Sequence, residues 1–447
     1  MAPALSTQLQ LSTTVEFETV SNNASSIYLM ATITAPEVED KRTPVDVTCV
    51  IDRSGSMSGE KIALMKETLS FMVEQLHDND KLSLVVFDDQ VDTLLPLTNM
   101  TAQSKVQATK LIESIQVDGS TNLSGALFEA LDICKGRKVA NDVGSIILFT
   151  DGRANKGILK TEDILTGLNG YLKLMKKPIN VFTLGFGGDH DENMLKSISE
   201  AGSGTYYYIT KNDEIPQAFS DCLGGLLSVT SQNIKLKFEV MKGVTLKAIH
   251  SNYKKLSTDQ ILLGDIYAEE TKDVVIEVEI EKSQHDVDNF ELVNFTLSYY
   301  NVLEKEPEDL EVTASVNRSN KSVPSTPNER LEQQKVRVQH AEALLQSKAA
   351  ADKGDYETAR TVLKCQIKRE EESPFAKSNA YFGQLATEMN DMIHHFESPQ
   401  IYREKGSKVL ISKWSESNYQ RSSEPTSEYA TRKKRSVYSN YLSKAKK

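Results

Sequence analysis

The stretch that decides the fold is Val45-Asp-Val-Thr-Cys-Val-Ile-Asp-Arg-Ser-Gly-Ser-Met57. Its first seven residues form a short, nearly continuous apolar run rich in β-branched side chains, which is typical of a strand buried on both faces of a parallel sheet. Asp52 is the first residue beyond this run, and Ser54 and Ser56 follow in a turn that the intervening glycine permits. Residues 57–77 then show the apolar spacing of a helix. The stretch therefore predicts a strand, a polar turn and a helix.

Outward from this stretch, buried-strand patterns alternate with amphipathic helical patterns. Strands are expected at 82–87, 145–150, 180–185 and 205–209, an edge strand at 91–95 that Pro96 ends, and helices at 101–116, 123–135, 161–176, 191–201 and 213–229. This alternation predicts a doubly wound, Rossmann-like α/β domain over residues 44–230, with a parallel sheet covered on both faces. Ligands of such domains bind beyond the carboxyl ends of the strands.

The flanking segments follow other patterns. Residues 1–43 and 231–323 alternate apolar and polar side chains, which predicts the half-buried antiparallel strands of a β-sandwich. The economical interpretation is that the first segment pairs into the later sandwich, so the α/β domain is an insertion between its strands. Residues 324–420 predict an α-helical C-terminal segment that begins with a helical hairpin. Residues 421–447 form a basic tail that we expect to be disordered.

Composition excludes several classes of protein. The 447 residues carry a net charge of −11, so a surface built for nucleic acid is not expected, although the tail has eight Lys or Arg and two Glu. No apolar stretch approaches the roughly 18 residues of a membrane-spanning helix, and the start lacks a secretory-signal pattern. The four cysteines form no Cys-x-x-Cys pair, which argues against zinc ribbons, RING domains and thioredoxin-like motifs. Reduced thiols and a cytoplasmic location are expected.

Polar residues follow two of the expected strands and also open one of the expected helices. Thr121 comes after Gly119-Ser120 at the start of the helix expected at 123–135, and Asp151 directly follows the strand expected at 145–150. Because the carboxyl ends of parallel strands lie at one edge of a sheet, five oxygen ligands are expected to meet there: Asp52, Ser54, Ser56, Thr121 and Asp151. Two carboxylates and three hydroxyls predict a site for Mg²⁺, with Mn²⁺ or Ca²⁺ as alternatives. One coordination position stays open for an Asp or Glu of a protein partner.

At these residues the sequence resembles the von Willebrand factor A-type domain. That family's metal-ion-dependent adhesion site consists of Asp-x-Ser-x-Ser, a downstream Thr and Thr-Asp-Gly, and all five positions have the expected residue types. The resemblance implies that Asp52 and Asp151 hold Mg²⁺ partly through water, that Ser54 and Ser56 bind it directly, and that Thr121 contributes as well. It also implies capture of an acidic ligand.

The resemblance covers about 44–230, and in some family members the closing helix, here 213–229, shifts. The flanking segments look similar to a subfamily in which the A-type domain is nested in a β-sandwich and followed by helices, as in plant WAV-type ubiquitin ligases. Those ligases have an N-terminal RING, whereas this sequence contains no zinc-ligand spacing of that kind.

These observations predict a non-catalytic, intracellular scaffold that binds an acidic side chain of a protein partner through Mg²⁺. One alternative is a structural subunit or a RING-less adaptor of a larger, ubiquitin-related assembly. A Mg²⁺-dependent hydrolase is a further alternative, which the three motifs disfavour because they contain no His, Cys or third carboxylate to act as a general base. The basic tail could contact an acidic protein surface.

Overall fold

The computed structural model describes residues 7–38, 42–209, 211, 214–321, 326–422, 427 and 429–445. Two compact units are present. The α/β unit is built from the described parts of 38–230 and 422–447, and the sandwich–helix unit from the described parts of 1–37 and 231–421. None of the helices formed by the described residues is long and apolar enough to cross a membrane.

The α/β unit is built on a six-stranded sheet with the order β6-β5-β4-β7-β8-β9. Its strands are β4 (Val45–Asp52), β5 (Lys81–Phe87), β6 (Val91–Asn99), β7 (Val143–Thr150), β8 (Asn180–Phe186) and β9 (Tyr206–Ile209). All neighbours pair in parallel except β5 and β6. The strand order reverses between β4 and β7, because β5 lies on one side of β4 and the later strands β7, β8 and β9 on the other. The predicted doubly wound fold is thereby confirmed.

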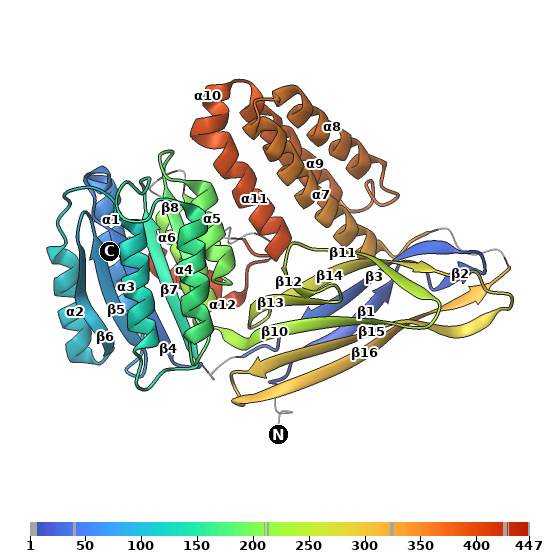
Figure 1. Cartoon of the computed structure of the whole chain (residues 1–447), viewed down its shortest axis with the longest axis horizontal. Coiled ribbons are helices and arrows are strands. Elements are labelled where there is room, and N and C mark those ends of the chain that lie inside the picture. Colours follow the sequence, from blue (N-terminus) through green and yellow to red (C-terminus); the bar gives the residue numbers. More distant parts are fainter. Residues whose placement is uncertain are drawn as a thin grey trace. The chain divides into compact units, whose positions relative to one another are not determined.

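The helices of the α/β unit follow the strands in the expected alternation. They are α1 (Glu60–Gln75), α2 (Ala102–Ser114), α3 (Leu123–Lys135), α4 (Thr161–Leu174), α5 (Glu192–Ala201) and α6 (Ile215–Leu226), with one 3-10 turn, η1 (Gly55–Met57), before α1. In Figure 1, α3 and α4 lie across one face of the sheet. Strands β4 and β7 are buried along their whole length, which explains their unbroken apolar sequences.

One expected strand end differs from the structure. The edge strand was expected to stop at Leu95, before Pro96, but β6 continues through Pro96 to Asn99. Proline lacks the N–H that a central strand needs, but an edge strand pairs on one side only and tolerates it. The pairing of β5 with β6 is irregular around Leu84, where the register shifts on both sides.

The tail corrects another expectation. Where disorder was expected over 421–447, the structure has a helix, α12 (Arg432–Ala445), which packs on α6. Residues 423–426, 428, 446 and 447 of that range lie outside the described residues. Lys434, Val437 and Tyr441 form the buried stripe of α12. Because one residue of this stripe is a lysine, the sequence of α12 does not show a clear amphipathic pattern. Its basic composition therefore suggested a solvated segment.

The sandwich of the second unit consists of two sheets, with the orders β1-β3-β14-β11 and β12-β13-β10-β15-β16-β2. The strands are β1 (Gln10–Val15), β2 (Thr19–Ser21), β3 (Ser25–Thr34), β10 (Val229–Val240), β11 (Val244–His250), β12 (Lys254–Ser257), β13 (Gln260–Tyr267), β14 (Thr271–Ile280), β15 (Val287–Asn301) and β16 (Glu306–Ser319). Strand β3 pairs antiparallel with β14, from Thr34 opposite Thr271 to Ser25 opposite Ile280. Strands from before and after the α/β domain therefore share one sheet, which confirms the insertion.

The helical part of the second unit follows the sandwich. Its helices are α7 (Glu329–Asp352), α8 (Tyr356–Glu372), α9 (Ala380–Ile393), α10 (Pro399–Ile401) and α11 (Ser407–Tyr419), with the short turns η3 (His394–Phe396) and η4 (Tyr402–Gly406). Gly354 takes a positive φ of 83° between α7 and α8, and the Asp355 carboxylate caps α8 by accepting the N–H of Thr358. The single tryptophan, Trp414, is buried in the core of these helices.

Candidate metal centre

The candidate centre lies where the strand order of the α/β sheet reverses. Strand β4 pairs in parallel with β7, with Ile51 opposite Phe149. Asp52 at the end of β4 and Asp151 just after β7 therefore emerge at the same edge of the sheet. Both side chains are almost fully buried, at 0% and 1% exposure. Two carboxylates in such surroundings require compensating hydrogen bonds or positive charge.

Hydrogen bonds fix the Asp52 carboxylate. Its Oδ1 accepts the backbone N–H of Ser54 at 2.8 Å, and its Oδ2 accepts the Thr150 hydroxyl at 2.6 Å. Burial raises the pKa of Asp52 to about 6, although the hydrogen bonds from Ser54 and Thr150 act in the opposite direction. Thr150 was not among the site residues predicted from the sequence. Its hydroxyl at the end of a buried strand, one residue before Asp151, was the available signal.

The two serines connect the first motif to the third. Ser54 Oγ and Ser56 Oγ lie 3.1 Å apart, and the Ser56 hydroxyl donates to Asp151 Oδ1 at 2.7 Å. Ser54 is buried, whereas Ser56 is exposed. The cluster is therefore closed by the sheet on one side and reachable from solvent on the side of Ser56.

The loop before α3 brings Thr121 to the same place. The N–H of Gly55 donates to the carbonyl of Gly119 at 3.3 Å, which joins this loop to the first motif. A Cβ atom placed on Gly152 would lie 3.4 Å from Thr121 Oγ1 and 3.6 Å from Ser56 Oγ. The two hydroxyls thus flank Gly152, so all five predicted side chains meet at one edge of the sheet.

Two further residues hold the loops around Thr121 and Asp151. Asn155 accepts the N–H of Thr121 through Oδ1 at 2.8 Å, and its own N–H donates to the Thr121 carbonyl at 3.1 Å. The ammonium of Lys61, in the first turn of α1, pairs with Asp151 Oδ2. Lys61 was not predicted from the sequence, because its contact with Asp151 depends on how α1 is oriented over the sheet.

The donor set fits a small, hard cation. Two neighbouring ligands of an octahedral Mg²⁺, each about 2.1 Å from the ion, lie about 3 Å apart. The 3.1 Å between Ser54 Oγ and Ser56 Oγ, and the 2.7 Å between Ser56 Oγ and Asp151 Oδ1, match that spacing. Among the described residues no group of three or more His, Cys, Asp or Glu could hold a metal. Hydroxyl oxygens would therefore have to complete a coordination shell that the two carboxylates begin.

Comparison with known proteins agrees with this geometry. Residues 46–221 match the model of the von Willebrand factor type A domain. The E3 ubiquitin-protein ligase WAV3 of Arabidopsis thaliana is 29% identical over 250 residues, which cover 54% of this chain and 31% of that protein. The uncharacterized protein YfbK of Escherichia coli (strain K12) is 23% identical over 276 residues, covering 60% of this chain and 47% of that protein. The chain thus spans less than half the length of these two relatives.

A solved structure has the same architecture. The von Willebrand factor type A structure from Catenulispora acidiphila superposes with a TM-score of 0.68 and covers 90% of this chain and 96% of that chain. Its sequence identity to this chain is 16%, so the likeness concerns the fold. Together, the sheet order, the motifs at the strand ends and the family match establish that residues 46–221 of this chain are a von Willebrand factor type A domain.

Proposed function

We propose that this chain is a metal-dependent protein-binding module that captures an acidic side chain of a partner through a Mg²⁺ ion at the candidate centre. The observation that carries the proposal is the convergence of oxygen atoms from three separate loops at one solvent-reachable edge. An ion bound there would supply an open coordination position for a carboxylate oxygen.

Each residue of the centre has a separate task in this proposal. Ser54, Ser56 and Thr121 supply neutral oxygens, while Asp52 and Asp151 supply the negative charge that favours a divalent cation over water. The hydroxyl of Thr150 and the N–H of Ser54 hold the Asp52 carboxylate in one orientation. Since two protein carboxylates leave a bound Mg²⁺ charge-neutral, a partner's carboxylate would bind mainly by direct coordination.

The proposal includes a non-catalytic role and a cytoplasmic location. None of the five proposed ligands is a His or Cys, so the ligand set contains no Ser–His or Cys–His pair of the kind that covalent catalysis uses. All four cysteines are free, and Cys49, Cys134 and Cys222 are buried, which suits a reducing compartment.

A second candidate is an adaptor or structural subunit of a ubiquitin-related assembly. It is favoured by the similarity to WAV3, which is named an E3 ubiquitin-protein ligase. In that case partners would bind chiefly to the sandwich, the helices or α12, and the metal centre would serve stability. Partners that co-purify equally with and without a chelator would support this candidate over metal-dependent capture.

Calorimetric titration of Mg²⁺ tests the first proposal. The wild type should release binding heat that Asp52→Asn abolishes, because the variant removes one of the two buried charges of the centre. Asp163→Asn is the matched control, since it removes the same charge at an exposed position in the first turn of α4 and should bind Mg²⁺ like the wild type. Equal heats from the wild type and Asp52→Asn would refute the proposed centre.

Binding of the partner's acid is tested separately. The wild type should be retained on a resin carrying capped Gly-Asp-Gly peptide in the presence of Mg²⁺ and released by EDTA. A Gly-Asn-Gly resin of equal density should not retain it, because a neutral amide oxygen is a weaker ligand for Mg²⁺ than a carboxylate oxygen. Retention that is equal on both resins would refute capture of an acidic side chain.

A further inference from the structure

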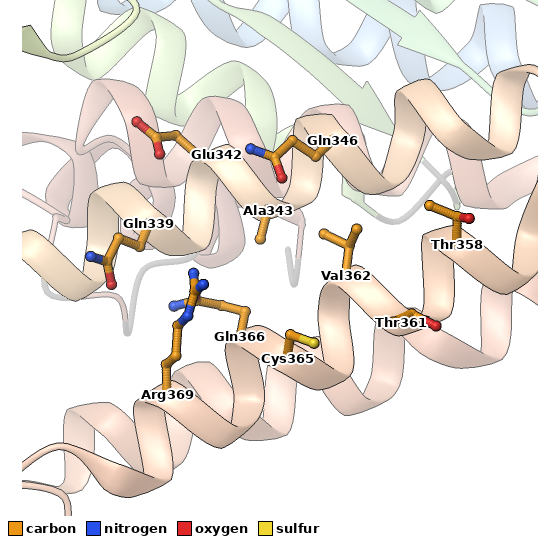
Figure 2. Close-up of a pocket in the computed structure, with 10 residues that line it drawn as sticks. All are labelled: Gln339, Glu342, Ala343, Gln346, Thr358, Thr361, Val362, Cys365, Gln366 and Arg369. Atoms are coloured by element: carbon orange, nitrogen blue, oxygen red, sulfur yellow. The ribbon is translucent and has the colours of Figure 1, made fainter.

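The helical part of the sandwich–helix unit carries a groove that is separate from the metal centre. It lies between α7 and α8, the two helices of the hairpin, and has a volume of about 280 Å³. Figure 2 shows Ala343 of α7 and Val362 of α8 facing each other across it, with Gln366 and Arg369 toward the end near Gln339. The groove thus has a small apolar centre and polar side chains around it.

Gln366 is the feature that points to a ligand. Its side chain is 98% buried, at 2% exposure, and its Nε2 donates to Glu370 Oε1 at 3.2 Å. A carboxylate only accepts hydrogen bonds, so Glu370 sets which way the Gln366 amide points. Gln366 Oε1 is left without a hydrogen-bond partner in the described part of the chain. A buried acceptor in that state costs about 1–3 kcal/mol, which a ligand N–H would recover.

Arg369 supplies the charge at one end of the groove. Its side chain is exposed, and it makes no ion pair or hydrogen bond with the residues that the structure describes. The groove's one acid, Glu342, is already 3.6 Å from the ring of His250. The free positive charge of the groove is therefore complementary to a carboxylate.

We propose that this groove binds a short, extended, acidic peptide segment of a partner protein. A peptide backbone offers an N–H to Gln366 Oε1 and carbonyl oxygens to the amides of Gln339 and Gln346, while an Asp or Glu side chain pairs with Arg369. The seven steps from Gln339 to Gln346 rise about 10 Å along α7, which is the length of about three extended residues. This proposal does not depend on the metal centre.

Cys365 makes occupancy of the groove measurable. It lines the groove and is exposed, whereas the other three cysteines of the chain are buried. Iodoacetamide should therefore alkylate Cys365 first, and a bound peptide should slow that reaction. The probe is a pool of capped tetrapeptides with one fixed Asp or Glu and the other positions randomised, and the control pool has Lys at the fixed position. All reactions contain EDTA, so failure of the metal-centre proposal cannot affect the result.

We expect the acidic pool to slow alkylation of Cys365 in the full chain by about threefold when two thirds of the sites are occupied, and the lysine pool to leave the rate unchanged. The quantity compared is the ratio of the rates with and without peptide, measured by intact mass for each variant. Arg369→Glu and the milder Arg369→Gln should lose the protection. Lys364→Glu, the matched control, reverses a charge beside Cys365 on α8 but outside the groove and should keep it.

A third substitution tests the buried acceptor. Gln366→Leu keeps the volume of the side chain but removes the amide, so protection by the acidic pool should weaken while alkylation without peptide persists. Absence of protection by the acidic pool, equal protection by both pools, or full protection of the Arg369 variants would each overturn the proposal. Even where a variant fails to fold, the comparison of the two pools on the wild type tests whether the groove binds an acidic peptide.

Discussion

Lys61 is the single residue whose position bears most directly on the candidate metal centre. Its ammonium pairs with the buried carboxylate of Asp151, so a positive charge already balances part of the centre's negative charge. A divalent cation and this ammonium would repel each other at a separation of a few ångströms, where unit charges near a protein surface interact by several kcal/mol. Mg²⁺ and Lys61 are therefore expected to compete for Asp151.

Removal of that competitor should strengthen metal binding. We expect Lys61→Met to bind Mg²⁺ about tenfold more tightly than the wild type, with the affinity measured by calorimetry. Lys66→Met is the matched control, because Lys66 lies on the same helix but donates to the carbonyl of Glu113. An affinity for Mg²⁺ that is unchanged or weaker in Lys61→Met would show that Lys61 supports the centre instead of competing with the ion.

At the scale of elements, α12 packs on the α/β unit through close and charged contacts. Lys434 Nζ lies 2.8 Å from Asp221 Oδ1 on α6, and the Tyr207 hydroxyl donates to Asp221 Oδ2 at 2.6 Å. A Cβ atom on Gly224 would lie 2.8 Å from Lys434 Cα, so the close approach of the two helices requires glycine there. Tyr441 also donates to Glu67 of α1 at 2.9 Å.

Loss of the buried ion pair should release α12. Removing one partner of such a pair costs about 3–5 kcal/mol, because the other charge is left buried. Lys434→Met should therefore raise hydrogen exchange across residues 432–443 and lower the thermal midpoint of the α/β unit. Lys433→Met, at the exposed neighbouring position, should leave both unchanged. Equal exchange in Lys434→Met and the wild type would mean that apolar contacts alone hold α12.

A buried histidine links three helices of the other unit. The ring of His340 on α7 contacts Glu370 of α8 at 3.0 Å and Glu388 of α9 at 3.1 Å. Burial by itself lowers the pKa of His340, but these hydrogen bonds and charges outweigh it and raise the pKa to about 9. The same contact lowers the pKa of Glu388, against the effect of its burial. The charged ring therefore stabilises the helices.

This arrangement makes the stability of the helices depend on pH. Because the pKa of His340 is higher in the folded chain than in the unfolded one, its contribution is complete below pH 6.5 and is lost as the pH rises through about 9. We expect up to about 3 kcal/mol of unfolding free energy to be lost between pH 6.5 and 9.5. In urea titrations, His340→Gln should lack that loss, whereas His394→Gln, at an exposed ring, should retain it.

At the scale of the whole molecule, the two units have separate cores and only one contains tryptophan. Trp414 is buried among the helices of the sandwich–helix unit, and all five residues of the candidate metal centre lie in the α/β unit. Tryptophan fluorescence therefore reports unfolding of the sandwich–helix unit alone, while far-ultraviolet circular dichroism reports unfolding of both units. The two signals allow stabilisation by a ligand to be assigned to one unit.

Mg²⁺ should stabilise only the α/β unit. At 100 times its dissociation constant, a ligand that binds only the folded state adds about 2.7 kcal/mol. We expect Mg²⁺ to shift the urea midpoint of one circular-dichroism transition upward and to leave the Trp414 fluorescence midpoint in place. A shift of equal size in the fluorescence midpoint would show that the two units unfold together.

The apolar patterning, together with the polar residues after β4 and β7 and before α3, was sufficient to predict the α/β sheet, the sandwich and the five side chains at the sheet edge. Buried parallel strands are apolar without interruption, and their carboxyl ends share one edge, so polar residues that directly follow such strands must lie near one another. Asp52 and Asp151 therefore follow from local sequence and topology, even though they are far apart in the chain.

Other features depended on tertiary packing. Thr150 reaches Asp52 only through the register of β7 against β4, and Lys61 reaches Asp151 only through the orientation of α1. The helix α12 was missed because its buried face carries Lys434, whose charge becomes acceptable only beside Asp221. Local sequence patterns predict which apolar side chains are buried. A buried charge, in contrast, is stabilised by a partner from a distant part of the sequence, so only the folded structure reveals that the charged residue is buried.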